Sequence, residues 1–124
     1  MTTRTTICAL TAALALAAVA GAAPPPRADL YGVVLLGPTR PVCETGVPCE
    51  APEPGVTLVF ARLGRVVGSV TTSRTGAYRI LLPAGTYAVH TTRKFHGGLV
   101  APPTVRVRAA ERLRVAFHLD SGIR

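Results

Sequence analysis

The stretch "TTSRTGAYRILLPAGTYAV", Thr71–Val89, decides the fold. It holds two short segments of alternating apolar residues around the turn sequence Pro-Ala-Gly at positions 83–85, a pattern typical of paired β-strands. Proline ends a strand because it has no backbone N–H to donate, and glycine gives a turn the backbone freedom that it needs. We therefore predict strands at Ala77–Leu82 and Thr86–Thr92, with Tyr87 anchoring the second.

The same alternation extends outward along the chain, and no segment after the N-terminal region repeats apolar residues at helical spacing over a helical length. Further strands are expected at Leu30–Leu36, Val56–Leu63, Arg65–Ser73, Thr104–Arg108 and Arg112–Leu119. Short strands spaced in this way predict an all-β fold, a seven-stranded antiparallel Greek-key β-sandwich of the Ig-like kind. The domain is expected to span residues 30–120, with a C-terminal tail at 121–124.

One apolar face of each predicted strand should form the core. The residues that alternation points to one side are Tyr78, Ile80, Leu82, Val89, Val105, Val107, Val115 and Phe117. With 5% aromatic residues and no Trp, this core is small, so a covalent staple would help the domain.

The central stretch resembles the signature of the carboxypeptidase regulatory-like domains, which belong to the prealbumin-like (transthyretin-like) group of β-sandwiches. The matching residues are Thr72, Gly76, Tyr78, Leu82, Pro83, Gly85, Tyr87 and Val89. Ser73 stands where the family often has Asp, and its hydroxyl can still cap the turn. The resemblance implies a non-catalytic accessory or interaction module, of a kind often attached to exported peptidases, receptors and surface proteins.

The N-terminus has the layout of a signal peptide. Arg4 forms a short basic head, an uncharged run rich in Ala and Leu follows at Ile7–Ala20, and small residues suited to cleavage lie near its end. We predict a signal peptide at 1–22 and a Pro-rich spacer at 23–29, hence a secreted, periplasmic or cell-envelope protein with no transmembrane segment after cleavage. An uncleaved anchor is the alternative. Cys8 lies at the start of the apolar run, which argues against a lipoprotein.

Two cysteines remain after this cleavage, Cys43 and Cys49, in "PVCETGVPCE". An even number of cysteines in a small exported domain indicates a disulfide bond. The C-x5-C spacing lacks both the C-x-x-C redox pattern and the tight paired ligands of a zinc site. We predict a disulfide that closes a small loop, with metal binding or free thiols as the alternatives.

The chain is basic, with 14 Lys and Arg against 6 Asp and Glu and a formal net charge of +8. Lys94 is the only lysine, and the sequence contains neither Asn nor Gln. That composition is typical of a GC-rich bacterial genome, so the basicity does not by itself predict nucleic-acid binding, and export separates the protein from most nucleic acid.

An enzymatic alternative is a small hydrolase of the hydroxyisourate hydrolase type, which shares the fold and uses His and Arg at a subunit interface. The C-terminal Tyr-Arg-Gly-Ser of that family is missing here. His90 and His118 fall on the polar sides of their strands, and His96 lies in a Gly-rich segment. Ser73, His90 and Asp29 make a hydrolytic set on paper, but no nucleophile-elbow pattern supports it. We expect no catalytic, cofactor-binding or metal-binding residues.

The last two predicted strands suggest a contact surface. If Val105, Val107 and the apolar residues of Arg112–Leu119 face inward, then Arg106, Arg108, Arg112 and Arg114 face outward together in a terminal hairpin. Like charges side by side repel unless an anion bridges them, so these four arginines form a candidate binding face for an anionic envelope polymer or an acidic protein. The alternative is a solvated arginine-rich surface without a ligand.

Overall fold

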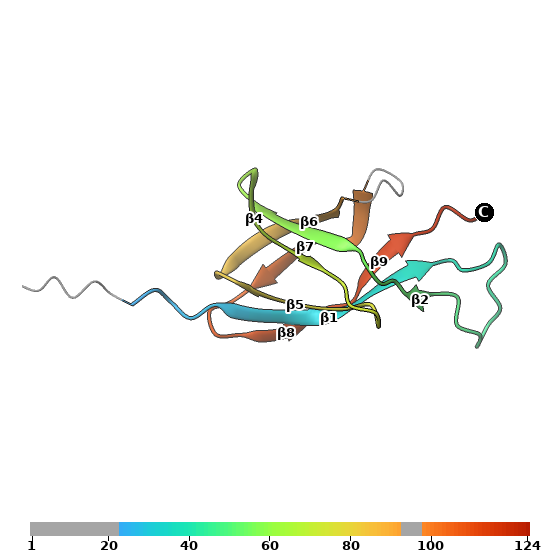
Figure 1. Ribbon diagram of the computed structural model, residues 1–124, viewed down its shortest axis with the longest axis horizontal. Coiled ribbons are helices and arrows are strands. Elements are labelled where there is room, and N and C mark those ends of the chain that lie inside the picture. Colours follow the sequence, from blue (N-terminus) through green and yellow to red (C-terminus); the bar gives the residue numbers. More distant parts are fainter. Residues whose placement is uncertain (1–22, 93–97) are drawn as a thin grey trace, which may run out of the picture.

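The computed structural model describes residues 23–92 and 98–124 (Figure 1). The predicted signal peptide at 1–22, together with Lys94 and His96, lies outside these residues. The described part of the chain is all β, as predicted, and contains nine strands. They are β1 (Ala28–Gly37), β2 (Ala51–Pro52), β3 (Thr57–Arg62), β4 (Arg65–Thr71), β5 (Ala77–Leu82), β6 (Gly85–Thr91), β7 (Leu99–Val107), β8 (Arg112–Arg114) and β9 (Phe117–Asp120).

The strands form one curled mixed sheet in the order β2-β1-β9-β7-β6-β3-β4, with β5 and β8 also paired to β1. Strands β4, β3, β6 and β7 are joined only by antiparallel pairs, and we call them the antiparallel layer. Strands β5, β1, β8, β9 and β2 gather around β1, and we call them the β1 layer. The pairing of β7 with β9 joins the two layers at one side.

Strand β1 is the centre of its layer because it changes partners along its length. Its first half lies between β5, which is antiparallel, and β8, which is parallel. Its second half pairs with β2 and runs parallel to β9. The prediction of a wholly antiparallel seven-stranded sandwich is therefore wrong in this layer. Parallel partners need a long connection, and the chain reaches β8 and β9 only after building the whole antiparallel layer.

The predicted strand Arg112–Leu119 is interrupted, because β8 ends at Arg114 and β9 begins at Phe117. At the break the Val115 N–H donates to the carbonyl oxygen of Tyr31 at 2.9 Å. The backbone there approaches so closely that a Cβ on Gly32 would lie 2.0 Å from the Val115 carbonyl oxygen. Only glycine fits this position, and the two halves of β1 can therefore serve two different parallel neighbours.

Strand β7 begins at Leu99, earlier than predicted, and includes two prolines that the pattern placed in a loop. Thr104 pairs with Ala88 of β6, whereas Leu99 pairs with His90, so residues 100–103 bulge away from β6. Two of them, Val100 and Ala101, pair with β9 instead. Proline cannot donate to a ladder and is tolerated at such bulges, which explains how Pro102 and Pro103 fit within a strand.

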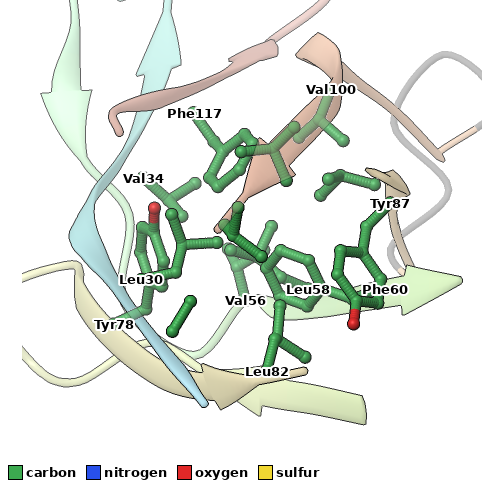
Figure 2. Packing of buried hydrophobic residues seen from close by; sticks show 14 of the residues in the cluster. Leu30, Val34, Val56, Leu58, Phe60, Tyr78, Leu82, Tyr87, Val100 and Phe117 are labelled. Carbon is green, nitrogen blue, oxygen red and sulfur yellow. The ribbon is translucent and has the colours of Figure 1, made fainter. Parts of the chain in front are cut away.

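The core lies between the two layers, and its largest side chains come from both (Figure 2). Phe117 of β9 contacts Tyr78 of β5 and Phe60 of β3, with ring centroids 5.4 and 6.1 Å apart. Of the predicted core residues, Tyr78, Leu82, Val89, Val105, Val107 and Phe117 are buried, while Ile80 and Val115 pack against the core half-buried. The prediction of the core from alternation is confirmed for these residues.

The motif residues of the central stretch perform structural tasks. The Thr72 hydroxyl, which is buried, donates to the Glu53 carbonyl at 2.8 Å and accepts the Val56 N–H at 2.9 Å. It thereby fixes the turn that leads into β3. A Cβ on Gly76 would lie 2.8 Å from Pro52 Cβ, so the turn between β4 and β5 needs glycine at this position.

The two motif tyrosines are buried, and each hydroxyl donates to a backbone carbonyl. Tyr87 donates to Pro83 across the β5–β6 turn, which gives it the anchoring role predicted for it. Tyr78 donates to Val115 at 2.6 Å, next to the break between β8 and β9. Burial raises the pKa of Tyr78, so this hydroxyl stays protonated and remains a donor.

The ends of the domain differ slightly from the predicted boundaries. Strand β1 begins at Ala28, inside the predicted spacer, and Asp29 is already paired with Leu81. In the C-terminal tail, Ser121 donates its N–H to the Gly37 carbonyl at 2.8 Å, and Arg124 forms an ion pair with Asp120 at 3.0 Å. The tail is therefore attached to the ends of β1 and β9.

Candidate binding face

The outer surface of β5, β1 and β8 gathers charged and aromatic side chains from three strands. Asp29 and Tyr31 alternate with the buried Leu30 on β1 and therefore point outward. Arg79 lies opposite Tyr31 on β5, and Arg114 lies opposite Tyr31 on β8. We call this surface the arginine–tyrosine face; it consists of Asp29, Tyr31, Arg79, Arg112 and Arg114.

Asp29 organises the arginines around it. The Arg79 guanidinium donates to both carboxylate oxygens of Asp29, from Nε at 2.9 Å and from Nη2 at 3.0 Å. Arg112 approaches the same carboxylate more loosely, with Nε 3.9 Å from Oδ2. Its guanidinium carbon also lies 4.7 Å from the centre of the Tyr31 ring, within cation–π range. Asp29 and Tyr31 therefore hold two arginines in defined orientations.

The charges on this face shift one another's titration. The hydrogen bonds from Arg79 hold the pKa of the Asp29 carboxyl below its ordinary value against partial desolvation, and the positive charges of Arg79 and Arg112 lower it further. The same hydrogen bonds raise the pKa of Arg79. Asp29 is therefore ionised at neutral pH, yet one carboxylate balances only one of the three guanidinium charges, and the face keeps a positive charge.

The predicted terminal hairpin does not exist, and this separates the four arginines of the predicted face. Strand β7 pairs with β6 and β9, whereas β8 pairs with β1 in the other layer (Figure 1). Arg106 lies opposite Thr86 on β6. Arg108 lies at the β7–β8 turn, where its backbone N–H donates to Glu111 Oε2 at 2.8 Å. The prediction that the four arginines share one face is wrong, because the chain crosses from one layer to the other after Val107.

All four arginines of the predicted face are nevertheless exposed, as alternation indicated. Arg112 and Arg114 belong to the arginine–tyrosine face, but their role in binding stays a prediction. The sequence pattern missed Arg79, Tyr31 and Asp29 as members of the face. The alternation in Ala77–Leu82 already pointed Arg79 outward, but nothing local showed that β1 lies between β5 and β8.

The predicted disulfide between Cys43 and Cys49 is present, with the two Cα atoms 5.6 Å apart. Its loop packs against the end of β1, since the Thr39 N–H donates to the Cys49 carbonyl at 2.8 Å. A Cβ on Gly37 would lie 2.6 Å from Glu50 Cγ, so glycine at this position lets the loop lie directly on the sheet. The loop is at the end of the molecule near the C-terminus (Figure 1).

A shallow groove of about 330 Å³ lies where this loop meets β7 and β9. Glu50 and His118 line it, and His118 Nδ1 is 3.0 Å from Glu50 Oε1. His90 is exposed on β6. Ser73 contacts Thr75 and Asp29 contacts Arg79, so each has a different partner from the hydrolytic set considered above.

Two kinds of feature are absent from residues 23–92 and 98–124. In these two ranges, His, Cys, Asp and Glu side chains do not gather in a group of three or more that could hold a metal ion. In the same ranges, no helix has the length and hydrophobicity needed to cross a membrane.

Comparison with known proteins gives little more. No protein-family model and no curated protein matches the chain. Among solved structures, the chain is similar to a DUF3823 family protein from Parabacteroides merdae ATCC 43184, with a TM-score of 0.47 and 21% identity. The match covers 77% of this chain and 46% of that one, so this chain spans less than half of the neighbour's length.

Proposed function

We propose that this chain is an exported, non-catalytic β-sandwich module of the carboxypeptidase regulatory-like type, which binds an anionic polymer or an acidic protein at the bacterial cell envelope. The observation that carries the proposal is the arginine–tyrosine face. Three arginines from two strands surround Tyr31, and two of them, Arg79 and Arg112, share the single carboxylate of Asp29.

The chemistry of the face suits anions on an extended ligand. Guanidinium groups bind carboxylates and phosphates through paired, planar hydrogen bonds, and Asp29 and Tyr31 orient Arg79 and Arg112 before a ligand arrives. Ordering these side chains in advance lowers the entropy lost on binding. Because the arginines lie along neighbouring strands of a sheet, successive anionic groups of a polymer can contact them in turn.

The remaining parts of the proposal have separate support. The Cys43–Cys49 bond is typical of an oxidising compartment, and the sequence of residues 1–22 has the pattern of a signal peptide. The motif residues that carry the family resemblance serve turns and core packing, which supports a stable scaffold for a surface site.

One contact favours the second candidate function, a small hydrolase of the transthyretin-like group. Glu50 holds Nδ1 of His118 in the shallow groove, which leaves Nε2 as the ring nitrogen for proton transfer. Assays of hydroxyisourate hydrolysis with the wild type and with His118→Gln separate the two candidates. The binding-module proposal expects no turnover by either protein.

The binding proposal is tested by retention on isolated cell envelope across a salt series. The double variant R112S/R114S removes two charges from the arginine–tyrosine face, and R106S/R108S removes two charges elsewhere. We expect at least about tenfold weaker retention for the first and nearly unchanged retention for the second, since each charge-assisted hydrogen bond is worth about 1.5 to 3 kcal/mol. Equal retention of wild type and R112S/R114S would contradict the proposal. Equal losses of retention in both double variants would also contradict it, because they would show that binding depends on net charge and not on this face.

A further inference from the structure

The turn between β3 and β4 has a residue that its conformation does not favour. Arg62 and Arg65 are directly paired, so Leu63 and Gly64 form a two-residue hairpin loop. Both have positive φ, +51° for Leu63 and +75° for Gly64, the combination of a type I′ turn. Such turns favour Asn, Asp or Gly at the first position, and a left-handed conformation is unfavourable for other residues. Folding alone would select a different residue from leucine.

This unfavourable leucine is also the most exposed of the large apolar side chains in the described part of the molecule. Leu63 is 93% exposed, and the neighbouring Val66 and Val67 are 65% and 43% exposed. Phe60 pairs with Gly68 and Ala61 with Val66, which leaves Val67 as the extra residue of a bulge. We call Leu63, Val66 and Val67 the apolar tip. It lies at the end of the molecule away from the disulfide loop (Figure 1).

Positive charge surrounds the apolar tip. Arg62 and Arg65 face each other across the strands, where like charges repel. Arg62 donates to the Ala84 carbonyl at 3.1 Å, which holds its guanidinium at the base of the hairpin, and Arg65 is exposed. The sequence contains no Asp or Glu between Glu53 and Glu111. An anionic surface is therefore the complement of this hairpin.

We propose that the apolar tip inserts into the interface of an anionic lipid membrane. Leu63 and Val66 would enter the boundary between headgroups and acyl chains, while Arg62 and Arg65 contact lipid phosphates. A protruding tip of three apolar side chains is much smaller than the roughly 800 Å² per partner of a specific protein interface, but it suits shallow insertion into lipid. The proposal uses other residues and another ligand than the arginine–tyrosine face, so it stands or falls independently of the proposed function.

Co-sedimentation with lipid vesicles tests the proposal. The wild type should bind vesicles that contain phosphatidylglycerol and bind pure phosphatidylcholine vesicles much less. Leu63→Asn should bind phosphatidylglycerol vesicles about tenfold more weakly, because the burial of one leucine is lost. Asparagine suits a type I′ turn, so this variant should melt at the same temperature as the wild type or higher, which separates lost binding from lost folding.

Two further variants complete the test. Arg65→Ser should weaken binding about fivefold at low salt, since one arginine near an anionic membrane contributes about 1 kcal/mol. Leu99→Asn is the matched control, because Leu99 is an exposed leucine of the same layer outside the hairpin, and it should bind as the wild type does. Unchanged vesicle binding by Leu63→Asn would overturn the proposal. Photo-crosslinking from position 63 to a protein rather than to lipid in native envelope would overturn it too.

Discussion

The two layers of the curled sheet differ in how their strands pair and in how they carry charge. The antiparallel layer is built mainly from strands that are close in the sequence, and none of its strands contains an Asp or Glu. The β1 layer joins segments from both ends of the chain, and all six acidic residues lie in or beside its strands and loops. Local hairpins thus form a plain cationic layer, whereas distant segments meet to form the organised charge cluster.

This difference explains why the number of arginines alone does not locate a site. Arg106 on β7 lies opposite a threonine, whereas Arg79 and Arg112 on the other layer are held by Asp29. A carboxylate between arginines orients them and reduces their mutual repulsion. The layer that contains the carboxylates is therefore the one in which a carboxylate orients neighbouring arginines.

The largest effect is expected where β1 meets its two parallel neighbours. Gly32→Ala places a Cβ 2.0 Å from the Val115 carbonyl oxygen, so the β8–β9 segment must move. We expect a loss of at least about 3 kcal/mol in the free energy of unfolding, measured by urea denaturation. Gly64→Ala in the antiparallel layer meets no atom within 4 Å and should cost only the left-handed backbone penalty, about 1 kcal/mol. Equal losses would show that the β1 junction is not tightly packed.

A smaller effect is expected at the turn that leads from the β1 layer into the antiparallel layer. Thr72→Val removes a buried hydroxyl that donates to the Glu53 carbonyl and accepts the Val56 N–H. Losing both hydrogen bonds should lower the free energy of unfolding by about 2 to 3 kcal/mol, which thermal denaturation would show as a lower melting temperature. The neighbouring Thr71→Val is the control, because Thr71 is exposed, and its effect should stay within about 0.5 kcal/mol. A Thr72→Val variant as stable as the control would contradict the role of this hydroxyl.

The disulfide loop should contribute about 2 kcal/mol, because it closes a short ring in the unfolded chain. Denaturation curves with and without reductant should differ by this amount for the wild type and coincide for C43S/C49S. The intact protein should be lighter than its reduced form by the mass of two hydrogens. Alkylation of Cys43 and Cys49 without reductant would refute the bond.

The smallest effect is a change in titration on the arginine–tyrosine face. Carboxyl NMR of Arg79→Ala should show a higher pKa for Asp29, because its strongest hydrogen bonds are lost. Arg112→Ala should raise that pKa less, since Arg112 is 3.9 Å away. Because folding lowers this pKa, the Asp29 contribution to stability is present at neutral pH and is lost as the pH falls below 3.8 through the folded value. If the Asp29 carboxyl titrates at the same pH in Arg79→Ala as in the wild type, the ion pair between Asp29 and Arg79 does not persist in solution.

The sequence predicted the two strands beside the central turn well because the information there is local. The Pro-Ala-Gly turn at 83–85 and the alternation around it placed β5 at its observed bounds and β6 within one residue. Alternation also identified core side chains such as Val107 and Phe117, since inward and outward positions follow from the two-residue period.

The parallel pairs of the β1 layer could not be predicted in the same way, because pairing between residues far apart in the chain leaves no local signal. The pattern of Arg112–Leu119 indicated one continuous strand, and only the approach of Val115 to Gly32 explains the break. For the same reason, the full set of residues in the candidate site could not be predicted from the sequence. Its arginines could be assigned to an outer surface, but Tyr31 and Asp29 join Arg79 and Arg112 only through the observed order of strands.

The most direct measurement of the central claim is an NMR titration of the ¹⁵N-labelled protein with short polyglutamate, a soluble anionic polymer. We expect the amide signal of Tyr31 and the amide and guanidinium signals of Arg79, Arg112 and Arg114 to shift together and to saturate. The signals of Arg106, in the layer without carboxylates, should stay nearly constant. Equal shifts in both layers, or shifts confined to the antiparallel layer, would contradict the claim that the arginine–tyrosine face is the binding surface.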